Sequence, residues 1–327
     1  MLTRNCFKWT PVFVLFFCLM GLAPRAGAAY PDRPVRLVIP VPPGGAADFI
    51  GRLFAERLGQ ELGQTVVVEN KAGASGMIAS QQVARSDADG YTLLLSSSTS
   101  HGTAPVVVRS PLYDPLADFT HIGLIATVPA VVVVNKALPV TTVAELIDYA
   151  NKNKGQLNYG SSGTGSPLHL WGELFKSVTG ASLQHVPYKG AGPAVMDLVA
   201  GRIQIMFDGV PSQLGNIQSG NTRALATMND TRSTVLPDLP TMGEVGFPKV
   251  VGGLWFGISG PKGVPDEVVN RLSAALFKVT DMPDVRDTYA QRGVLTTPMK
   301  PSAYSDFISN ENKKYSEVVR TSGMTLE

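Results

Sequence analysis

Cysteine is almost missing from this sequence: Cys6 and Cys18 are the only two in 327 residues. There is also no block of like charges and no glycine at every third position. These absences exclude a disulfide-stapled scaffold, the electrostatic footprint of a nucleic-acid or acidic-lipid binder, and collagen. The hydrophobic share of 44% is enough for globular cores and excludes wholesale disorder. The length favours two domains of ordinary size.

The first 29 residues have the pattern of a secretory signal peptide. Arg4 and Lys8 form a basic start, an apolar run of 12 residues covers 12–23, and Ala26-Gly27-Ala28 suits a signal peptidase. The apolar run is too short to span a bilayer, although an uncleaved anchor is the alternative. Cys18 follows two phenylalanines where a lipoprotein signal has small residues, so we expect no lipid anchor.

Cleavage after this segment changes the charge and the thiol content of the chain. It removes three of the 28 basic residues, no acid and both cysteines, so that 25 basic residues stand against 26 acidic ones. A chain of the remaining length is stable on its hydrophobic cores without disulfides. No later segment is long and apolar enough for a transmembrane helix. We therefore expect a soluble, exported protein, which in a bacterium lies in the periplasm.

Apolar strand patterns alternate with helical periodicity along the rest of the chain. The strands are expected at 35–41, 65–69, 91–96, 126–134, 157–159, 184–186, 203–207, 223–228 and 252–259. Helices are expected at 49–62, 78–85, 143–151, 168–178, 193–200 and 212–219, and the segment after 265 reads as three further helices at 265–279, 283–292 and 302–320. Strands separated by helices predict α/β units with mostly parallel sheets.

The strand and helix pattern restarts half-way, which indicates two similar α/β lobes. We predict that residues 30–130 together with 255–327 form lobe 1 and that residues 131–254 form lobe 2. The chain would pass between the lobes near Val131 and again near Trp255. We expect Trp171, Trp255 and Phe256 to be packed in the cores, because each lies on an apolar element.

Each half has one strand that ends in a glycine-rich turn and then opens a helix. The first turn is Pro42-Pro43-Gly44-Gly45-Ala46-Ala47-Asp48 and the second runs from Gly160 to Pro167. Unpaired amides at a helix N-terminus bind anions, and glycine lets a ligand approach the backbone closely. Tight turns without a ligand are the alternative. Neither turn matches a P-loop or a dinucleotide fingerprint.

Other polar residues near these turns point less clearly to a binding or catalytic role. The hydroxyls of the second turn (Ser161, Ser162, Thr164, Ser166) and those of the stretch from Ser96 to Ser100, which precedes His101, can donate to an anion or be solvated. Asp48 is either a helix N-cap or a ligand contact. His169 and Glu173 lie four apart, but no third metal ligand is near, and no Gly-x-Ser-x-Gly elbow occurs. We expect no metal, no cofactor and no enzymatic activity.

Several motifs then resemble one family along the whole chain from Tyr30 onward. They are YPDRPVRLVIPVPPGGAAD at 30–48, VVVEN at 66–70, DGYTLL at 89–94, YDP at 113–115, VPYKG at 186–190, MFD at 206–208 and LPDLPT at 236–241. These motifs are similar to the Bug family, the periplasmic solute-binding proteins of tripartite tricarboxylate transporters. The resemblance implies a type II periplasmic-binding fold, with two α/β lobes of mostly parallel sheets around a ligand cleft.

The resemblance also implies which residues bind a ligand carboxylate. Both glycine-rich turns contribute in the family, largely through backbone amides and ordered waters. The residues expected to bind the ligand are Gly44, Gly45, Ala46, Ala47, Asp48, Ser100, His101, Ser161, Ser162, Gly163, Thr164, Gly165, Ser166, Tyr188, Lys189 and Asp208. The stretch Thr99-Ser100-His101-Gly102 departs from the Thr-His-Ala-Ile of many relatives, so an unusual ligand is expected.

Our interpretation is a periplasmic binding protein that captures a small organic carboxylate by lobe closure, without covalent chemistry. Its expected partners are that ligand and the membrane subunits of a tripartite tricarboxylate transporter, with no nucleic acid, and we expect a monomer. Two alternatives stay open from the sequence. The first is a receptor that presents its ligand to a membrane sensor, and the second is a periplasmic hydrolase that uses His101 or His169.

Overall fold

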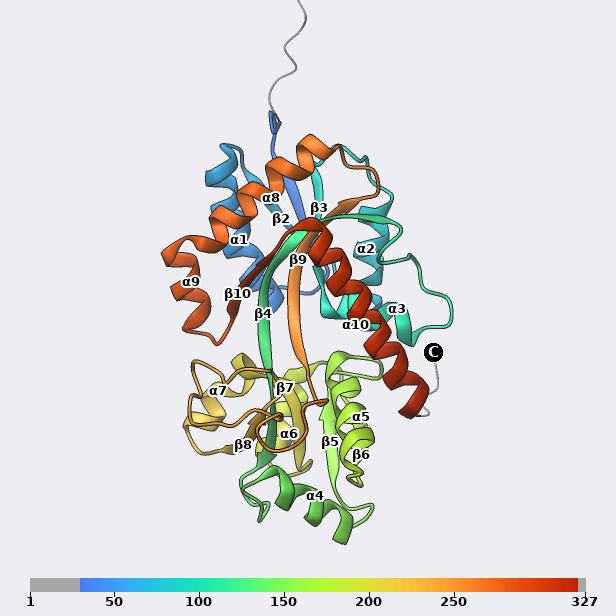
Figure 1. Cartoon of the computed structure of the whole chain (residues 1–327), viewed down its shortest axis with the longest axis vertical. Coiled ribbons are helices and arrows are strands. Elements are labelled where there is room, and N and C mark those ends of the chain that lie inside the picture. The colour runs from blue at the N-terminus through green and yellow to red at the C-terminus, as the bar shows by residue number, and fades with distance from the viewer. Residues whose placement is uncertain (1–29, 323–327) are drawn as a thin grey trace, which may run out of the picture.

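Strands and helices alternate along residues 30–322, the part of the chain that this computed structural model describes (Figure 1). The expected signal peptide lies outside these residues. The strands are β1 Val35–Ile39, β2 Val66–Asn70, β3 Thr92–Ser97, β4 Phe119–Asn135, β5 Asn158–Ser161, β6 Gln184–Pro187, β7 Ile205–Gly209, β8 Thr222–Thr227, β9 Gly253–Pro261 and β10 Leu295–Met299.

The helices cover the strands in both halves of the molecule. They are α1 Ala46–Leu62, α2 Met77–Ala84, α3 Ala104–Val107, α4 Val143–Lys152, α5 Pro167–Thr179, α6 Ala191–Val199, α7 Val210–Gln218, α8 Asp266–Asp281, α9 Pro283–Ala290 and α10 Pro301–Ser322, with a 3-10 turn η1 at Ala74–Gly76 and a π-helical turn η2 at Ser98–Thr103. None of the helices between residues 30 and 322 has both the length and the apolar character that crossing a membrane requires.

The long strand β4 belongs to two sheets at once. Its first part pairs with β9 and β10, and β9 continues through β3 and β1 to the edge strand β2. Its last part, from Ala130 to Asn135, pairs with β7 and β8, and β7 continues through β5 to the edge strand β6. Each sheet forms the centre of one α/β lobe, with lobe 1 above and lobe 2 below in Figure 1.

The direction of β4 fixes the direction of every other strand. Strand β9 is antiparallel to β4, β3 is antiparallel to β9, and β1 is parallel to β3, so β1 and β3 both run toward lobe 2. In lobe 2, β7 is antiparallel to β4 and β5 is parallel to β7, so both of these strands run toward lobe 1. The carboxyl ends of β1, β3, β5 and β7 therefore point at the opposite lobe.

The two lobes share one strand arrangement. The order β2-β1-β3 in lobe 1 matches β6-β5-β7 in lobe 2, and in each lobe the third of these strands pairs with an antiparallel crossing strand. Strand β1 thus corresponds to β5, and the glycine-rich turn after β1 corresponds to the one after β5. The similarity of the two halves that we expected from the sequence is confirmed by this topology.

Helix ends follow local sequence signals. Gly63 ends α1 in a left-handed conformation (φ 72°) with its N–H donating to the carbonyl of Gly59. Gly180 ends α5 in the same way (φ 70°), and Pro167 opens α5 where its missing N–H costs nothing. Thr142 and Glu145 form a capping box at the start of α4. These residues therefore mark where the helices begin or end.

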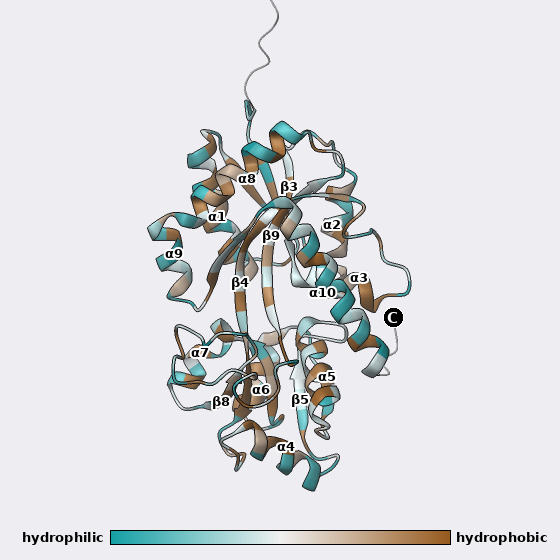
Figure 2. Ribbon diagram, in the orientation of Figure 1, coloured by the Kyte–Doolittle hydropathy of each residue, from teal (hydrophilic) through white to brown (hydrophobic). Residues whose placement is uncertain are grey.

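Separate hydrophobic cores lie on either side of the crossing. Figure 2 shows the brown central strands and the helices with teal on their outer sides. Val131 to Val134 are fully buried in the lobe 2 core, whereas Ile125 and Val128 belong to the lobe 1 core. Trp171, Trp255 and Phe256 are all buried, as expected, at 0%, 2% and 4% exposure.

Two parts of the sequence interpretation were wrong. Strand β10 lies between the expected helices 283–292 and 302–320, where we expected no strand, and β4 begins at Phe119 instead of Ala126. The short β10 contains Pro298 and pairs only with β4, across a register shift, where a strand tolerates proline. The start of β4 lacks a clear apolar pattern because Thr120, His121 and Gly123 interrupt it.

The C-terminal helix α10 spans both lobes. With 22 residues it is about 33 Å long. Glu311 accepts a hydrogen bond from Trp255 of β9 (3.1 Å), and Tyr315 accepts one from Trp171 of α5 (3.0 Å). The lobe boundaries stay a prediction. The end of α10 agrees least with the predicted assignment of residues 255–327 to lobe 1, because Tyr315, Val318 and Val319 pack in the lobe 2 core.

We predict that Tyr315→Phe destabilises the protein by about 1–3 kcal/mol, because it leaves the buried indole N–H of Trp171 without a partner. Urea unfolding followed by fluorescence gives the free energy of unfolding. Tyr149→Phe on α4 is the matched control, because the Tyr149 hydroxyl has no hydrogen bond among the described residues and its loss should change little. Equal stabilities of the Tyr315→Phe variant and the wild type would contradict the role of this contact.

Candidate functional site: two glycine-rich turns at the facing ends of the lobes

Turn 1, residues 42–48, joins β1 to α1 and presents unpaired amides. Gly45 is the N-cap of α1 and provides no side chain, so the first amides of the helix are not capped. No residue between 30 and 322 accepts a hydrogen bond from the N–H of Gly45, Ala46 or Ala47. Gly44 and Gly45 are exposed, and Gly44 has a φ of 96°, which favours glycine. This turn can therefore donate to an anion from the lobe 2 side.

Asp48 holds turn 1 in shape. Its Oδ2 accepts a hydrogen bond from Gly44 N at 3.0 Å, and its Oδ1 accepts from Arg52 Nε at 2.9 Å and from Asn70 Nδ2 at 2.8 Å. Burial alone would raise the pKa of Asp48, but these hydrogen bonds and the Arg52 charge lower it, so the carboxylate is ionised. Asp48 is not the N-cap that we considered, because Gly45 takes that position. Its carboxylate folds back four residues and accepts from the amide of Gly44, which is therefore already occupied.

Turn 2, residues 160–167, joins β5 to α5 and also presents free donors. Among the described residues nothing accepts from the N–H of Ser162, Thr164 or Leu168, and the Ser162 and Thr164 hydroxyls have no partner either. The amides of Gly163 and Gly165, which we expected to bind ligand, donate instead to Ser161 Oγ and His169 Nδ1, both at 3.1 Å. The two glycines shape the turn, and the residues between and beside them offer the donors.

A stacked pair of histidines lies beneath turn 2. The rings of His169 and His185 are 3.7 Å apart and nearly parallel (10°). His185 Nε2 contacts Ser161 Oγ at 2.6 Å, and Ser166 Oγ donates to the carbonyl of Gly163 at 2.7 Å. Ser161 and Ser166 are thus occupied within the turn. Their hydroxyls are not free donors, because the backbone of turn 2 and His185 already use them.

Ser100 and His101 lie at the correct end of lobe 1 but have fully buried side chains. The π-helical turn η2 after β3 folds them inward, where the His101 ring packs on Phe119 at 4.6 Å between ring centroids. Ser100 Oγ contacts His101 Nδ1 at 3.2 Å. Neither side chain reaches the surface, so the burial does not favour the expected ligand contacts through them, which stay a prediction. Thr99 is the part of η2 that remains partly exposed.

The remaining expected ligand residues also differ in their surroundings. Asp208 at the end of β7 is buried, and its carboxylate accepts from Gly209 N, Ser212 Oγ and Gln213 Nε2. Burial raises the pKa of Asp208, although these hydrogen bonds oppose the rise. Asp208 thus holds the start of α7, and the expected ligand contact through it stays a prediction. Tyr188 N donates to Ser161 O, its hydroxyl donates to Asp197, and Lys189 is exposed beside turn 2.

The pair His169 and Glu173 makes no metal centre. Glu173 is bound by Lys176 at 2.8 and 2.9 Å and by the Tyr159 hydroxyl at 2.7 Å, and His169 Nε2 is 3.9 Å away. Within residues 30–322, no three histidine, cysteine or acidic side chains come together in a way that suits a metal ion. The lysine and the tyrosine use the carboxylate that a metal would need.

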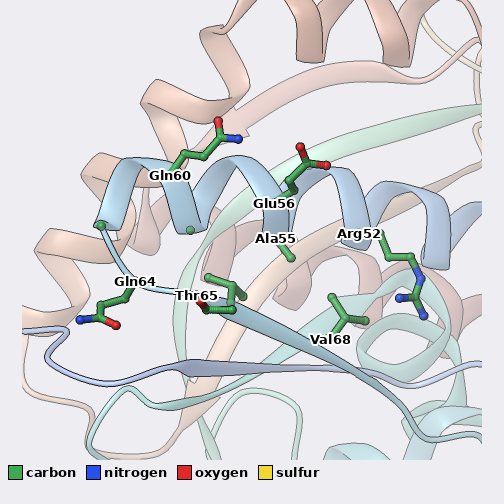
Figure 3. Close-up of a pocket in the computed structure, with 10 residues that line it drawn as sticks. Arg52, Ala55, Glu56, Gln60, Gln64, Thr65 and Val68 are labelled. Atoms are coloured by element: carbon green, nitrogen blue, oxygen red, sulfur yellow. The ribbon is translucent and has the colours of Figure 1, made fainter.

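A surface hollow on lobe 1 lies away from the turns (Figure 3). It runs along the side of α1 and the edge strand β2, and Glu56, Gln60, Gln64 and Thr65 line it. Of the residues around turn 1, it shares only Arg52. Its lining has no free helix N-terminus, so it offers a carboxylate none of the donors that turns 1 and 2 present.

Three supporting residues escaped the sequence interpretation. Arg52 and Asn70 hold Asp48, and His185 holds Ser161. The spacing of Asp48 and Arg52 by four on one helix was a usable signal. Asn70 and His185 had none, because they reach the turns only through the pairing of β1 with β2 and of β5 with β6.

Comparison with known proteins shows the family to which this chain belongs. The family model described as "Tripartite tricarboxylate transporter family receptor" matches residues 50–324. The chain belongs to this family. The receptor is 36% identical over 329 residues to Protein BugT of Bordetella pertussis, an alignment that covers 99% of this chain and 100% of the relative. The resemblance that we noted in the sequence is therefore confirmed.

Solved structures agree with this assignment. R. palustris Rpa4515, solved with adipate, superposes on the receptor with a TM-score of 0.82 at 36% identity and covers 90% of this chain and 99% of its own. MatC from Rhodopseudomonas palustris, solved with bound malate, gives 0.78 at 30% identity and covers 89% and 100%. The receptor is thus a solute-binding protein and not an enzyme, and the hydrolase alternative is dropped.

The receptor should lose stability in mild acid because the fold lowers the pKa of each of its four histidines. Burial lowers the pKa of His121 to about 4. Burial, together with the nearby His169 and Lys176, lowers the pKa of His185 to about 3. Burial also lowers the pKa of His101 and that of His169. Unfolded histidines bind protons below about pH 6.5. The unfolded state then binds more protons, so the free energy of unfolding falls as the pH drops from 6.5 toward 3.

Urea unfolding at pH 7.5, 6.5 and 5.5 measures this effect. We expect the free energy of unfolding to decrease across the series, and to decrease less in His121→Asn, which removes one of the four titrating groups. A free energy of unfolding that stays constant or rises as the pH falls in this range would show that the histidines are protonated in the folded receptor.

Proposed function

We propose that the receptor binds a small dicarboxylate between turn 1 and turn 2 and delivers it to the membrane subunits of a tripartite tricarboxylate transporter. One observation carries the proposal: the two turns follow equivalent strands, lie at the facing ends of the two lobes, and both open helices with unpaired amides. A carboxylate held by both turns would be bound by charge-assisted hydrogen bonds in a site of low dielectric constant.

The ligand class is supported by the relatives as well. Adipate and malate, the compounds named with the two R. palustris structures, are small dicarboxylates. The free donors of the receptor are backbone amides and the hydroxyls of Ser162 and Thr164, which suit carboxylate oxygens. Residues 1–29 would serve as a cleaved signal peptide that exports the receptor to the periplasm, where we propose that it acts as a monomer.

The lobes would close on the ligand by bending where the chain crosses between them. A ligand that contacts one turn from each lobe binds the closed state better than the open state and shifts the population toward it. We assign residues 30–130 with most of 255–327 to lobe 1 and residues 131–254 to lobe 2. The part of β4 near Val131 and the chain leading into β9 connect these lobes.

Titration calorimetry with adipate, malate and their monoamides tests the ligand class. We expect at least one diacid to bind, and replacement of one carboxylate by an amide to cost at least about 2 kcal/mol, the scale of hydrogen bonds to charged groups. Equal affinities of a diacid and its monoamide would contradict a carboxylate site. Binding of neither diacid would exclude these two ligands and move the search to other carboxylates.

Ser162→Pro tests turn 2 as part of the site. It removes one free amide donor and distorts the turn, so we expect two things to be lost together: ligand binding, and the few ångströms of compaction that lobe closure on the ligand should produce in small-angle scattering. Ser162→Ala, which keeps the amide, is the matched control and should retain most of the affinity. Circular dichroism checks that both variants are folded. Wild-type affinity in Ser162→Pro would show that turn 2 does not hold the ligand.

A further inference from the structure

Turns 1 and 2 are braced by the same kind of contact. In each helix the third residue folds its side chain back to the residue that precedes the N-cap, four positions earlier. Asp48 Oδ2 accepts from Gly44 N at 3.0 Å, and His169 Nδ1 accepts from Gly165 N at 3.1 Å. Both braces are buried, with 6% and 5% exposure. The equivalence extends from the strand order down to a single hydrogen bond.

The two braces differ in charge. Asp48 is a carboxylate in the first turn of α1, where it compensates the positive end of the helix dipole. The first turn of α5 contains no acidic residue. His169 must be neutral at Nδ1 to accept from Gly165, and burial, with Lys176 nearby, lowers its pKa. The N-terminus of α5 therefore has no carboxylate in its first turn to oppose its positive potential, whereas that of α1 has one.

The other charged groups around His169 do not cancel this difference. Glu173 lies one turn further along α5, and Lys176 binds both of its oxygens. His185 from β6 stacks on His169 with its own pKa lowered to about 3, so it carries no charge at neutral pH. Tyr159 from β5 donates its hydroxyl to Glu173. On α1, Arg52 pairs with Asp48 itself, half-exposed to solvent.

We propose that His169 is a positioning residue that makes turn 2 the principal holder of the ligand carboxylate, because it braces the turn without adding a negative charge. Turn 2 also has the only free hydroxyls of the two turns within the described chain, those of Ser162 and Thr164, while turn 1 offers amides flanked by the methyl groups of Ala46 and Ala47. The carboxylate thus approaches an uncompensated helix end. This inference rests on the proposed function.

Exchange of the braces tests the proposal. His169→Asp keeps an acceptor for Gly165 and copies the charge of turn 1, so we expect it to weaken binding of the diacid found by calorimetry by about tenfold or more, as one charge near a bound anion does. His169→Asn offers a neutral acceptor at the position of Nδ1 and should recover most of the affinity that His169→Ala loses. Glu56→Gln on α1, which is exposed and lies away from both turns, is the charge control.

A pH series separates charge from damage to the fold. The loss in His169→Asp should shrink as the pH falls through the pKa of the introduced carboxyl group, which a merely structural defect would not do. Hydrogen exchange of the Gly165 amide should stay slow in His169→Asn and become fast in His169→Ala. Wild-type affinity in a folded His169→Asp, or equal losses in His169→Asn and His169→Asp, would overturn the inference. A wild type that binds no carboxylate at all overturns the proposed function first, and the inference with it.

Discussion

The backbone ladder of β4 is the interaction on which the arrangement of this receptor depends. One strand of 17 residues pairs with β9 and β10 in its first part and with β7 and β8 in its last part. Its direction sets the direction of β1, β3, β5 and β7, and so brings their carboxyl ends to the facing sides of the two lobes. The helices that follow these strands must begin there, with their unpaired amides. Two facing helix ends with unpaired amides therefore result from a single shared strand.

Pairing partners change at one narrow point of this strand. Pro129 is the last β4 residue paired with β9, opposite Gly253, and Ala130 is the first paired with β7, opposite Gly209. Proline has no amide to commit to either sheet. Glycine at the two facing positions leaves little side-chain packing to resist rotation, although a Cβ at Gly253 would lie 3.0 Å from the carbonyl of Val128. The residues at the change of partners thus carry few side chains that would oppose a twist of the strand there.

The sequence predicted the parts of this structure that depend on local chemistry. Strand and helix alternation, the glycine-rich turns, Gly63 at the end of α1 and Pro167 at the start of α5 all follow from nearby residues. It missed contacts that need tertiary pairing. His101 looked like a cleft residue because it follows a strand end, and only the π-helical turn shows that its ring faces Phe119. Strand β10 has no periodic pattern of its own and exists because β4 supplies a partner.

The C-terminal helix limits how the lobes can move. Trp255 and Trp171 bind to Glu311 and Tyr315, four residues apart on α10, and Asn312 donates to the carbonyl of His101. Three elements therefore join the lobes: β4, the chain leading into β9, and α10. The first two can twist near Pro129, but α10 contacts lobe 2 through packed, buried side chains that cannot stretch. A rotation that keeps the Trp171–Tyr315 contact must pivot close to it, so turn 2, which opens the same helix as Trp171, should move through a short arc. If the ligand binds between the turns, as we propose, a site near a pivot needs only small displacements to close, and the charge and donor set of each turn then decide how tightly the ligand is held.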